Sequence, residues 1–283
     1  MDDSHAYSLT EKPFVAAITP PEDGGEGAYL FAFRGFRLLV EEGEEGTAVP
    51  FATTPEALGL VPLSRHYLGT LDGRACYALE LAEDAQAPEG MAFRGLRSLY
   101  GRLDEDFFWV AGRAVQIVDW DRSHRFCGRC GAETELQAKE RARVCPHCDH
   151  SYYPRLAPAI IVAVTRGDRL LLARSHRHPA GLYSVLAGFV EPGETLEECV
   201  LREVKEEVGI DVTNIRYFGS QPWPFPHSLM IAFTCQYAGG EIVLGEEEMA
   251  DAAWFEAGDL PRVPPPLSIS RHLIDWFVAR NPS

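Results

Sequence analysis

Short apolar runs separated by turn residues fill the first hundred residues and predict a β-rich domain. Residues 28–40 read as two strands joined at Arg34-Gly35, and residues 67–81 read as two strands joined at Asp72-Gly73. Asp-Gly is a dipeptide that tight hairpin turns favour. The acidic, glycine-rich segment EEGEEG that begins at Glu41 predicts a surface loop.

The same domain is expected to end in two helices, over residues 91–103 and 104–120. No residue pattern in this region indicates a chemistry of its own. The interpretation is therefore a scaffold or a dimer-forming domain, which makes a homodimer the expected assembly.

From residue 155 onward the pattern changes to α/β. Strands are predicted over residues 159–164, 169–173, 215–218, 229–237, 241–244 and 252–255, with Gly167-Asp168 in the first turn. A closing helix over residues 268–280 would carry Ile269, Leu273, Ile274 and Phe277 on one apolar face.

The most regular pattern lies between Thr195 and Gly209. Thr195 and Glu198 have the spacing of a capping box, so a helix should begin near Leu196, and Gly209 is a natural residue to end it. At about 100° per residue its apolar stripe consists of Val200, Val204 and Val208, with Leu196 at the edge.

Three glutamates of this helix, Glu203, Glu206 and Glu207, lie at or beside the edge of the apolar stripe. The opposite side carries Glu198, Arg202 and Lys205. Carboxylates crowded near a buried face repel one another unless a cation lies among them. The pattern favours a divalent metal site over the alternative, an amphipathic helix with solvated surface glutamates.

A second candidate metal site lies between the two halves of the chain. Cys127 and Cys130 form one C-x-x-C pair, and Cys145 and Cys148 form another fourteen residues later. Four thiolates complete a tetrahedral Zn²⁺ site with no open position, so one structural zinc is predicted. Disulfides are the alternative. A zinc ribbon can also contact nucleic acid, although a structural spacer between two domains is the favoured interpretation.

Composition and charge limit the function. The chain has 283 residues and a net charge of −16, which argues against a general nucleic-acid binder. The acidic, polar N-terminus does not resemble a signal peptide, and the apolar run over residues 157–164 is too short to cross a bilayer. A cytoplasmic protein without a membrane partner is expected. Divalent metal would explain how so acidic a chain could accept an anionic substrate.

Residues 188–210, GFVEPGETLEECVLREVKEEVGI, match every fixed position of the Nudix box, the signature of Mg²⁺-dependent hydrolases of nucleoside diphosphate derivatives. The segment SQPWPFP, which begins at Ser220, follows at a short distance as a proline-stiffened loop that presents two aromatic rings. Together with the cysteine pairs, these motifs resemble the NADH pyrophosphatase subfamily of Nudix hydrolases. The resemblance covers the chain from Cys127 to its end.

The residue pattern and this resemblance together predict an α+β fold with an N-terminal β-rich domain (residues 1–121), a zinc ribbon (122–153) and a C-terminal Nudix α/β/α sandwich (154–283). It also implies a set of site residues. More than one Mg²⁺ or Mn²⁺ ion would be held by Ala187, Glu203, Glu206, Glu207 and Glu248, with Glu246 and Glu247 as alternatives to Glu248. The substrate would meet Phe189, the loop Gln221, Pro222, Trp223, Pro224, Phe225, Pro226, His227 and Ser228, and the outlying residues Arg97, Glu140, Tyr153 and Ser270.

The activity implied is hydrolysis of NADH or NAD⁺ to a nicotinamide mononucleotide and AMP, with Glu207 as general base and Arg202 orienting a box glutamate. Cleavage of the same pyrophosphate in NAD-capped RNA is a further expectation. Its RNA contacts would come from two local basic groups, Arg141 with Arg143 in the ribbon, and Arg174 with Arg177 in the basic segment 174–178 before the box. The alternatives are a Nudix hydrolase of ADP-ribose or a dinucleoside polyphosphate, and a zinc-ribbon adaptor with an inactive Nudix fold.

Overall fold

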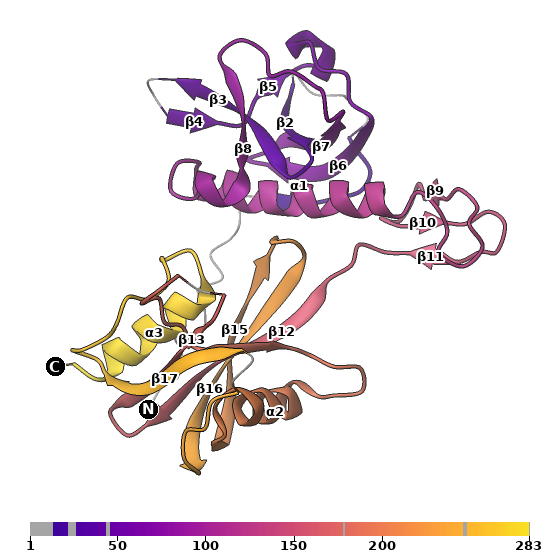
Figure 1. Cartoon of the computed structure of the whole chain (residues 1–283). Coiled ribbons are helices and arrows are strands. Elements are labelled where there is room, and N and C mark those ends of the chain that lie inside the picture. The colour runs from indigo at the N-terminus through magenta and orange to yellow at the C-terminus, as the bar shows by residue number, and fades with distance from the viewer. Residues whose placement is uncertain (1–13, 22–26, 44–45, 178, 246–247, 283) are drawn as a thin grey trace. The chain divides into compact units, whose positions relative to one another are not determined.

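The computed structural model describes residues 14–21, 27–43, 46–177, 179–245 and 248–282 (Figure 1). These residues form two compact units, one ending at Arg155 and the other beginning at Leu156. The predicted α+β class is confirmed, with a β-rich N-terminal part, a small cysteine-bearing sheet and a C-terminal sheet with helices. None of the helices in the described part of the chain is long and apolar enough to span a membrane.

The first unit contains an eight-stranded sheet with the central order β1-β6-β7-β2-β3-β4, while β5 pairs with β2 and β8 with β3. Its strands are β1 (Phe14–Ala16), β2 (Ala28–Arg34), β3 (Arg37–Gly43), β4 (Gly46–Ala48), β5 (Phe51–Ala52), β6 (Ser64–Leu71), β7 (Arg74–Leu81) and β8 (Met91–Gly95). Both predicted hairpins are present. The turn between β6 and β7 holds Asp72 and Gly73 at φ values of 49° and 75°, the left-handed conformation that Asp-Gly favours.

Two predictions for this unit are wrong. Residues 91–103 do not form a helix, because Met91–Gly95 pairs with β3 as strand β8 and only the short 3-10 helix η2 (Leu96–Leu99) follows. The expected loop after Glu41 is instead a hairpin, in which β3 continues to Gly43 and β4 begins at Gly46. For residues 91–95 the hydrogen-bond partner is β3, about fifty residues earlier, which a local pattern cannot reveal. A second 3-10 helix, η1, spans Pro55–Leu58.

The helix predicted over residues 104–120 is confirmed as α1 (Glu105–Ser123), capped by Asp104. It packs against the sheet through a long apolar face that includes Phe108, Val115 and Val118. At its C-terminal end lies a three-stranded sheet of β9 (Glu135–Leu136), β10 (Arg143–Val144) and β11 (Ser151–Tyr152), which carries the four cysteines (Figure 1).

The second unit is a six-stranded sheet with the order β15-β16-β12-β13-β17, while β14 pairs with β12. Its strands are β12 (Ala157–Arg166), β13 (Arg169–Ser175), β14 (Leu186–Phe189), β15 (Asp211–Trp223), β16 (Ser228–Gly239) and β17 (Met249–Glu256). Alternate residues of β12 face two separate cores. Ile160, Val162 and Val164 pack under helix α2 (Leu196–Val208), whereas Ile161 and Ala163 pack under helix α3 (Ile269–Arg280). This is the predicted α/β/α sandwich.

Two further predictions need correction. Residues 241–244 form no strand, because Val243 and Gly245 donate their N–H groups to carbonyls of Val208 and Glu207 at the end of α2. The proline-rich loop is also shorter than expected. Strand β15 continues to Trp223 and β16 starts at Ser228, so only residues 224–227 form the turn.

Candidate active site and zinc cluster

Helix α2 is capped at both of its ends. The Thr195 side chain accepts from the Glu198 N–H, the Glu198 carboxylate accepts from the Thr195 N–H, and Gly209 closes the helix at φ 75°. Val200, Val204 and Val208 are fully buried against the sheet, as the stripe predicts. This orientation fixes where the glutamates of the same helix point.

Glycine at position 188 lets Glu203 reach the sheet. A Cβ atom built on Gly188 would lie 1.8 Å from the carboxyl carbon of Glu203, so any side chain at this position would displace the Glu203 carboxylate. Gly188 belongs to β14, where it pairs with Ile160. The carboxylate of Glu203 therefore lies directly against the backbone of β14, one residue from both Ala187 and Phe189.

Among the residues that the structure describes, Glu207 is an unusually buried carboxylate. Only 5% of its surface is exposed, and its Oε2 atom is buried without a hydrogen-bond partner. Burial, together with the charges of Glu203, Glu248 and Glu206, raises the pKa of Glu207 to about 8. An ionised carboxylate in this place needs a cation, and a divalent metal ion fits both the oxygen donors and the charge.

Arg202 holds this carboxylate group together. Its guanidinium donates two hydrogen bonds to Glu194, at 2.7 and 2.9 Å, and one each to Glu203 and Glu206, at 2.8 and 3.0 Å. It also donates to the Phe189 carbonyl at 2.9 Å. The predicted salt bridge is confirmed, although Arg202 lies among the box glutamates and not opposite them. The Arg202 contact lowers the pKa of Glu194 to about 2.

Aromatic rings lie on two neighbouring parts of the same unit. Phe189 lies on β14, close to the point where Glu203 of α2 meets that strand. Its side chain is 59% exposed, so it does not serve to fill the apolar core. In the β15–β16 hairpin, the rings of Trp223 and Phe225 meet edge to face with centroids 5.1 Å apart. Rings held in this way can stack on a flat heterocycle at little entropic cost.

The four cysteines converge as the zinc interpretation predicts. The sulfur atoms of Cys127, Cys130, Cys145 and Cys148 all lie within 4.8 Å of one another, the one cluster of this kind among the described residues. The Sγ atoms of Cys127 and Cys148 are 3.6 Å apart and those of Cys130 and Cys145 are 3.4 Å apart. A disulfide would require about 2.05 Å, whereas a tetrahedral Zn²⁺ with 2.3 Å bonds places its sulfurs about 3.8 Å apart. The cluster therefore fits zinc.

Comparison with known proteins agrees with this geometry. Three family models match consecutive parts of the chain: the NADH pyrophosphatase-like rudimentary NUDIX domain (residues 27–120), the NADH pyrophosphatase zinc ribbon domain (122–153) and the NUDIX domain (155–277). The NAD-capped RNA hydrolase NudC of Pseudomonas putida strain W619 is 53% identical over 219 residues, which are 77% of this chain and 79% of that protein. The NudC of Pseudomonas aeruginosa strain LESB58 is 52% identical over 77% of this chain and 78% of its own.

The chain belongs to the NADH pyrophosphatase family of Nudix hydrolases. Among solved structures, a NUDIX hydrolase from Nitrosomonas europaea is similar with a TM-score of 0.47 and 20% identity, covering 55% of this chain and 91% of that one. The family membership makes the protein a hydrolase and identifies the cysteine cluster as its zinc ribbon.

Within this Nudix hydrolase, the remaining expected metal ligands lie near the carboxylates. Ala187 precedes Gly188 on β14. The charge of Glu248 contributes to the raised pKa values of Glu203 and Glu207, so its carboxylate lies within electrostatic reach of theirs. The carbonyl of Glu248 accepts from the His176 N–H at 3.1 Å, which anchors this segment to the end of β13. The alternatives Glu246 and Glu247, like His178 of the basic group, lie outside the described residues.

The expected substrate residues differ in how accessible they are. In the hairpin Pro222 and Pro226 are exposed, Trp223, Phe225 and His227 are half-buried, and Pro224 and Ser228 are buried. Gln221 is also buried, and both ends of its amide are engaged: it donates to the Leu267 carbonyl and accepts from the Ile269 N–H at the start of α3. The buried hydroxyl of Ser270 lies 2.7 Å from that of Ser184. Gln221 and Ser270 thus connect α3 to the sheet.

Three expected contacts belong to the first unit. The Tyr153 hydroxyl donates a hydrogen bond to the Glu140 carboxylate at 3.0 Å, which raises the pKa of Tyr153. Two of the substrate contacts that the resemblance implies therefore touch each other. Arg97 is exposed on η2.

The interpretation of Arg141 and Arg143 as exposed RNA contacts is wrong. Arg141 donates to the carbonyls of Ala17 and Tyr67, at 3.1 and 2.9 Å. Arg143 is buried and ion-paired with Asp121 of α1. These arginines fasten the zinc ribbon to the N-terminal sheet and to α1, so they are structural.

The sequence analysis predicts no role for Glu194. In the structure its carboxylate accepts two hydrogen bonds from Arg202. The signal for it was present, because Glu194 occupies a fixed position of the box. A charged residue held at constant spacing from an arginine of the same motif is a candidate partner for that arginine.

Proposed function

We propose that this Nudix hydrolase cleaves the pyrophosphate of NADH and NAD⁺, giving nicotinamide mononucleotide and AMP. It also cleaves the same bond in NAD-capped RNA, which releases nicotinamide mononucleotide and leaves a 5′-monophosphate on the RNA. The observation that carries the proposal is the carboxylate group on α2, which includes the unpartnered oxygen of Glu207 and places Glu203 against β14 beside Phe189. The NudC relatives, named for hydrolysis of NAD-capped RNA, support the substrate.

The glutamates of α2 are proposed to have two different roles, metal binding and proton transfer. Glu203 and Glu206, with Glu248 and the carbonyl of Ala187, would hold Mg²⁺ or Mn²⁺ ions, which neutralise the pyrophosphate and acidify water when bound. Glu207 would take the proton from the attacking water. A base whose pKa is raised toward neutrality is well suited to that step. Arg202 would keep Glu203 and Glu206 in position through the contacts described above.

The ring of Phe189 and the hairpin rings of Trp223 and Phe225 are proposed to hold the two heterocycles of the dinucleotide. Tyr153, Glu140 and Arg97, which lie in the other unit, and the hairpin residues from Gln221 to Ser228 are the remaining proposed contacts. A cytoplasmic homodimer is the proposed state, supported by the family resemblance.

The proposal is tested by incubating purified protein with Mg²⁺ or Mn²⁺ and a substrate panel, with the products separated by chromatography. The panel contains NADH, NAD⁺, ADP-ribose, a dinucleoside polyphosphate, NAD-capped RNA and triphosphate-ended RNA. NADH, NAD⁺ and NAD-capped RNA should be hydrolysed fastest. Faster turnover of ADP-ribose or of the dinucleoside polyphosphate would favour the alternative Nudix activities. Complete inactivity would favour the adaptor.

Phe189→Ala is expected to raise the KM for NADH about tenfold, because stacking on an aromatic ring is worth about 1–3 kcal/mol. The melting temperature should change little, since the ring is 59% exposed. Steady-state kinetics and thermal melts measure both quantities. Phe189→Trp, which keeps a ring, is the matched control and should retain a low KM. An unchanged KM in the alanine variant would remove Phe189 from the substrate site.

The raised pKa of Glu207 predicts how stability depends on pH. An ordinary glutamate has a pKa near 4.5 and Glu207 one of about 8, so the folded state binds the extra proton between these values. Without divalent metal, the free energy of unfolding should therefore fall on the order of 2–4 kcal/mol as pH rises from about 4.5 to 8. Added Mg²⁺ should stabilise the protein more at pH 8 than at pH 5, because the metal binds ionised carboxylates.

Denaturant unfolding at several pH values, with and without Mg²⁺, measures this dependence. Glu207→Gln cannot ionise and should show a flatter pH profile in Mg²⁺-free buffer. If the glutamine variant kept the full pH slope of the unchanged protein, another group would be responsible.

A further inference from the structure

One sulfur atom of the zinc cluster is contacted by a side chain that belongs to neither cysteine pair. The hydroxyl of Tyr152, at the end of β11, donates to Cys127 Sγ at 3.2 Å. The same oxygen accepts from the backbone N–H of Gly128 at 2.7 Å. A single hydroxyl group therefore binds both the first cysteine of the cluster and the residue that follows it. The sequence pattern predicts no role for Tyr152.

The two C-x-x-C turns are otherwise built alike. In the first turn, the Gly131 N–H donates to the Cys127 carbonyl at 2.8 Å, and Gly131 has a φ of 77°. In the second turn, the Asp149 N–H donates to the Cys145 carbonyl at 2.9 Å, and Asp149 has a φ of 56°. Within the part of the chain that the structure describes, no hydroxyl contacts the sulfur atoms of the second turn. The contact of Tyr152 thus distinguishes the first turn from the second.

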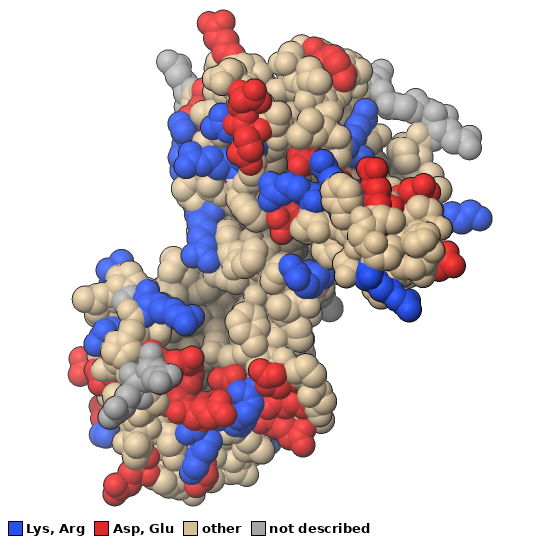
Figure 2. Space-filling model, turned by 45° about the vertical axis from the view of Figure 1, so that its right-hand side comes forward, with Lys and Arg blue, Asp and Glu red and all other residues tan. Residues whose placement is uncertain are grey.

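A hydrogen-bond donor at this sulfur matters because of the charge of the cluster. Four thiolates around Zn²⁺ leave a net charge of about −2. Arg141 and Arg143 of the ribbon are bound elsewhere, to backbone carbonyls and to α1. The face of the ribbon at the right of the upper unit in Figure 2 carries both basic and acidic side chains. Hydrogen bonds to the sulfurs are therefore the local means of stabilising the thiolates, and the N–H groups of Arg129 and Cys130 contribute to those at Cys127.

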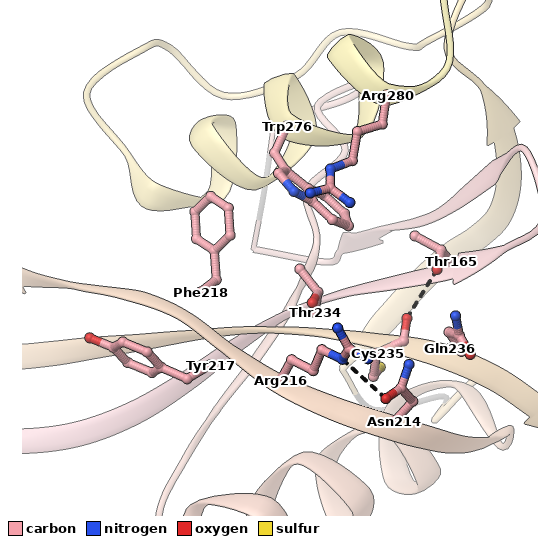
Figure 3. Close-up of a pocket in the computed structure, with 10 residues that line it drawn as sticks. All are labelled: Thr165, Asn214, Arg216, Tyr217, Phe218, Thr234, Cys235, Gln236, Trp276 and Arg280. Carbon is pink, nitrogen blue, oxygen red and sulfur yellow. Dashed lines mark hydrogen bonds between the residues drawn. The ribbon is translucent and has the colours of Figure 1, made fainter. Parts of the chain in front are cut away.

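Buried cysteines outside the ribbon have the opposite hydrogen-bond direction or none at the sulfur. Cys199 donates its S–H to the Phe189 carbonyl at 3.4 Å. Cys235 lies in the wall of a cavity of about 320 Å³ in the second unit, where its carbonyl accepts from Thr165 (Figure 3). Burial raises the pKa of Cys235 to about 12, so it remains a neutral thiol. At Cys127 a hydroxyl donates to the sulfur, which is the arrangement that suits a thiolate bound to metal.

The ring of Tyr152 is held by groups that do not belong to the cluster. Tyr152 pairs with Arg143 between β10 and β11. Its ring meets that of His150 edge to face with centroids 4.8 Å apart, and the ring of His124 lies 5.4 Å away on centroids. His124 is the C-terminal cap of α1. The hydroxyl is therefore directed at the Cys127 sulfur by the strand pair and by the end of α1.

We propose that Tyr152 is a positioning residue of the zinc site, which orients the Cys127 thiolate toward the metal and thereby retains zinc in the ribbon. Partners that orient a metal ligand from outside its coordination shell typically contribute about 10–100-fold to metal affinity. The ring also connects the metal site to α1 through His124. This inference does not depend on which substrate the enzyme cleaves, because it concerns only the ribbon.

Tyr152→Phe removes the hydroxyl and keeps the ring. The zinc-loaded variant should fold, but its zinc affinity should be about 10–100-fold lower than that of the unchanged protein. Equilibrium competition with a chromogenic zinc chelator measures this difference. Tyr153→Phe is the matched control, because it makes the same change at the next residue, whose hydroxyl bonds to Glu140. The control should retain zinc as the unchanged protein does. A zinc affinity within about twofold of the unchanged protein in Tyr152→Phe would overturn the proposal.

Binding of Co²⁺ in place of Zn²⁺ separates positioning of the ligand from a general loss of packing. A tetrahedral cobalt–thiolate site absorbs light by charge transfer from sulfur to metal. Without its hydrogen bond the Cys127 sulfur is a stronger electron donor, so Tyr152→Phe should move this absorption band to lower energy. His150→Leu, which removes a ring contact and leaves the hydroxyl in place, should lower the melting temperature without moving the band. An unmoved band in Tyr152→Phe would reduce Tyr152 to a packing residue and refute the proposal.

Discussion

Glu207→Gln is expected to reduce turnover of NADH by about 10²–10⁴-fold through loss of the general base alone, and further where metal binding is disturbed. Glutamine preserves the shape of the side chain but can neither accept the proton nor offer a charged ligand. Because Glu207 is buried beside three other carboxylates, removing its charge should not unfold the protein. Single-turnover kinetics at saturating Mg²⁺, with a thermal melt of the same sample, measure both effects.

Glu197→Gln is the matched control for this experiment. Glu197 lies on the same helix, in its first turn, but is exposed and has no part in the carboxylate group. It should keep nearly full activity. Activity within a few-fold of the unchanged protein in the Glu207 variant would refute the assigned role, and would move the search for the base to Glu203, Glu206 or Glu248.

The sequence predicts this helix well because its signals are local. Thr195, Glu198 and Gly209 determine its ends, and three valines determine its buried side. Hydrogen bonds between residues three or four positions apart need no information from the rest of the chain. The same reasoning explains why the hairpins at Gly35 and Asp72 are predicted correctly.

The errors at residues 91–95 and at Arg143 occur where the partner is distant in sequence. Residues 91–95 form a strand because β3, about fifty residues earlier, offers an unpaired edge. The basic local sequence around Arg143 favours an exposed side chain, yet Arg143 is ion-paired with Asp121 of another element. Burial of Glu207 likewise depends on the whole core beneath α2. A sequence pattern identifies the charged residues, but which of them remain exposed is decided by tertiary packing.

Zinc is expected to have the largest effect on stability. The metal would be held by four thiolates at the end of α1, and the hydroxyl of Tyr152 donates to the Cys127 sulfur at 3.2 Å, which lowers the pKa of Cys127 to about 5. A thiolate stabilised in this way is prepared for metal. The ribbon has few buried apolar residues of its own, so metal binding should supply most of its folding free energy.

Cys127→Ser is therefore expected to abolish zinc binding, unfold the ribbon and release Arg143 from Asp121. Loss of one partner of a buried ion pair costs about 3–5 kcal/mol by itself, so the melting temperature of the first unit should fall on the order of 10 °C. Elemental analysis should find one zinc per chain in the unchanged protein and none in the variant. Cys76→Ala, at a buried cysteine of β7 outside the ribbon, is the control and should keep its zinc.

The two-unit architecture makes this last experiment informative about catalysis as well. The box glutamates lie in the second unit, so kcat for NADH should survive zinc loss better than the stability of the first unit does. The KM should rise, because Tyr153 and Glu140, the proposed substrate contacts near the ribbon, lose their fixed positions. A zinc-free variant with unchanged melting temperature and unchanged KM would show that the ribbon neither stabilises the fold nor contributes to the substrate site.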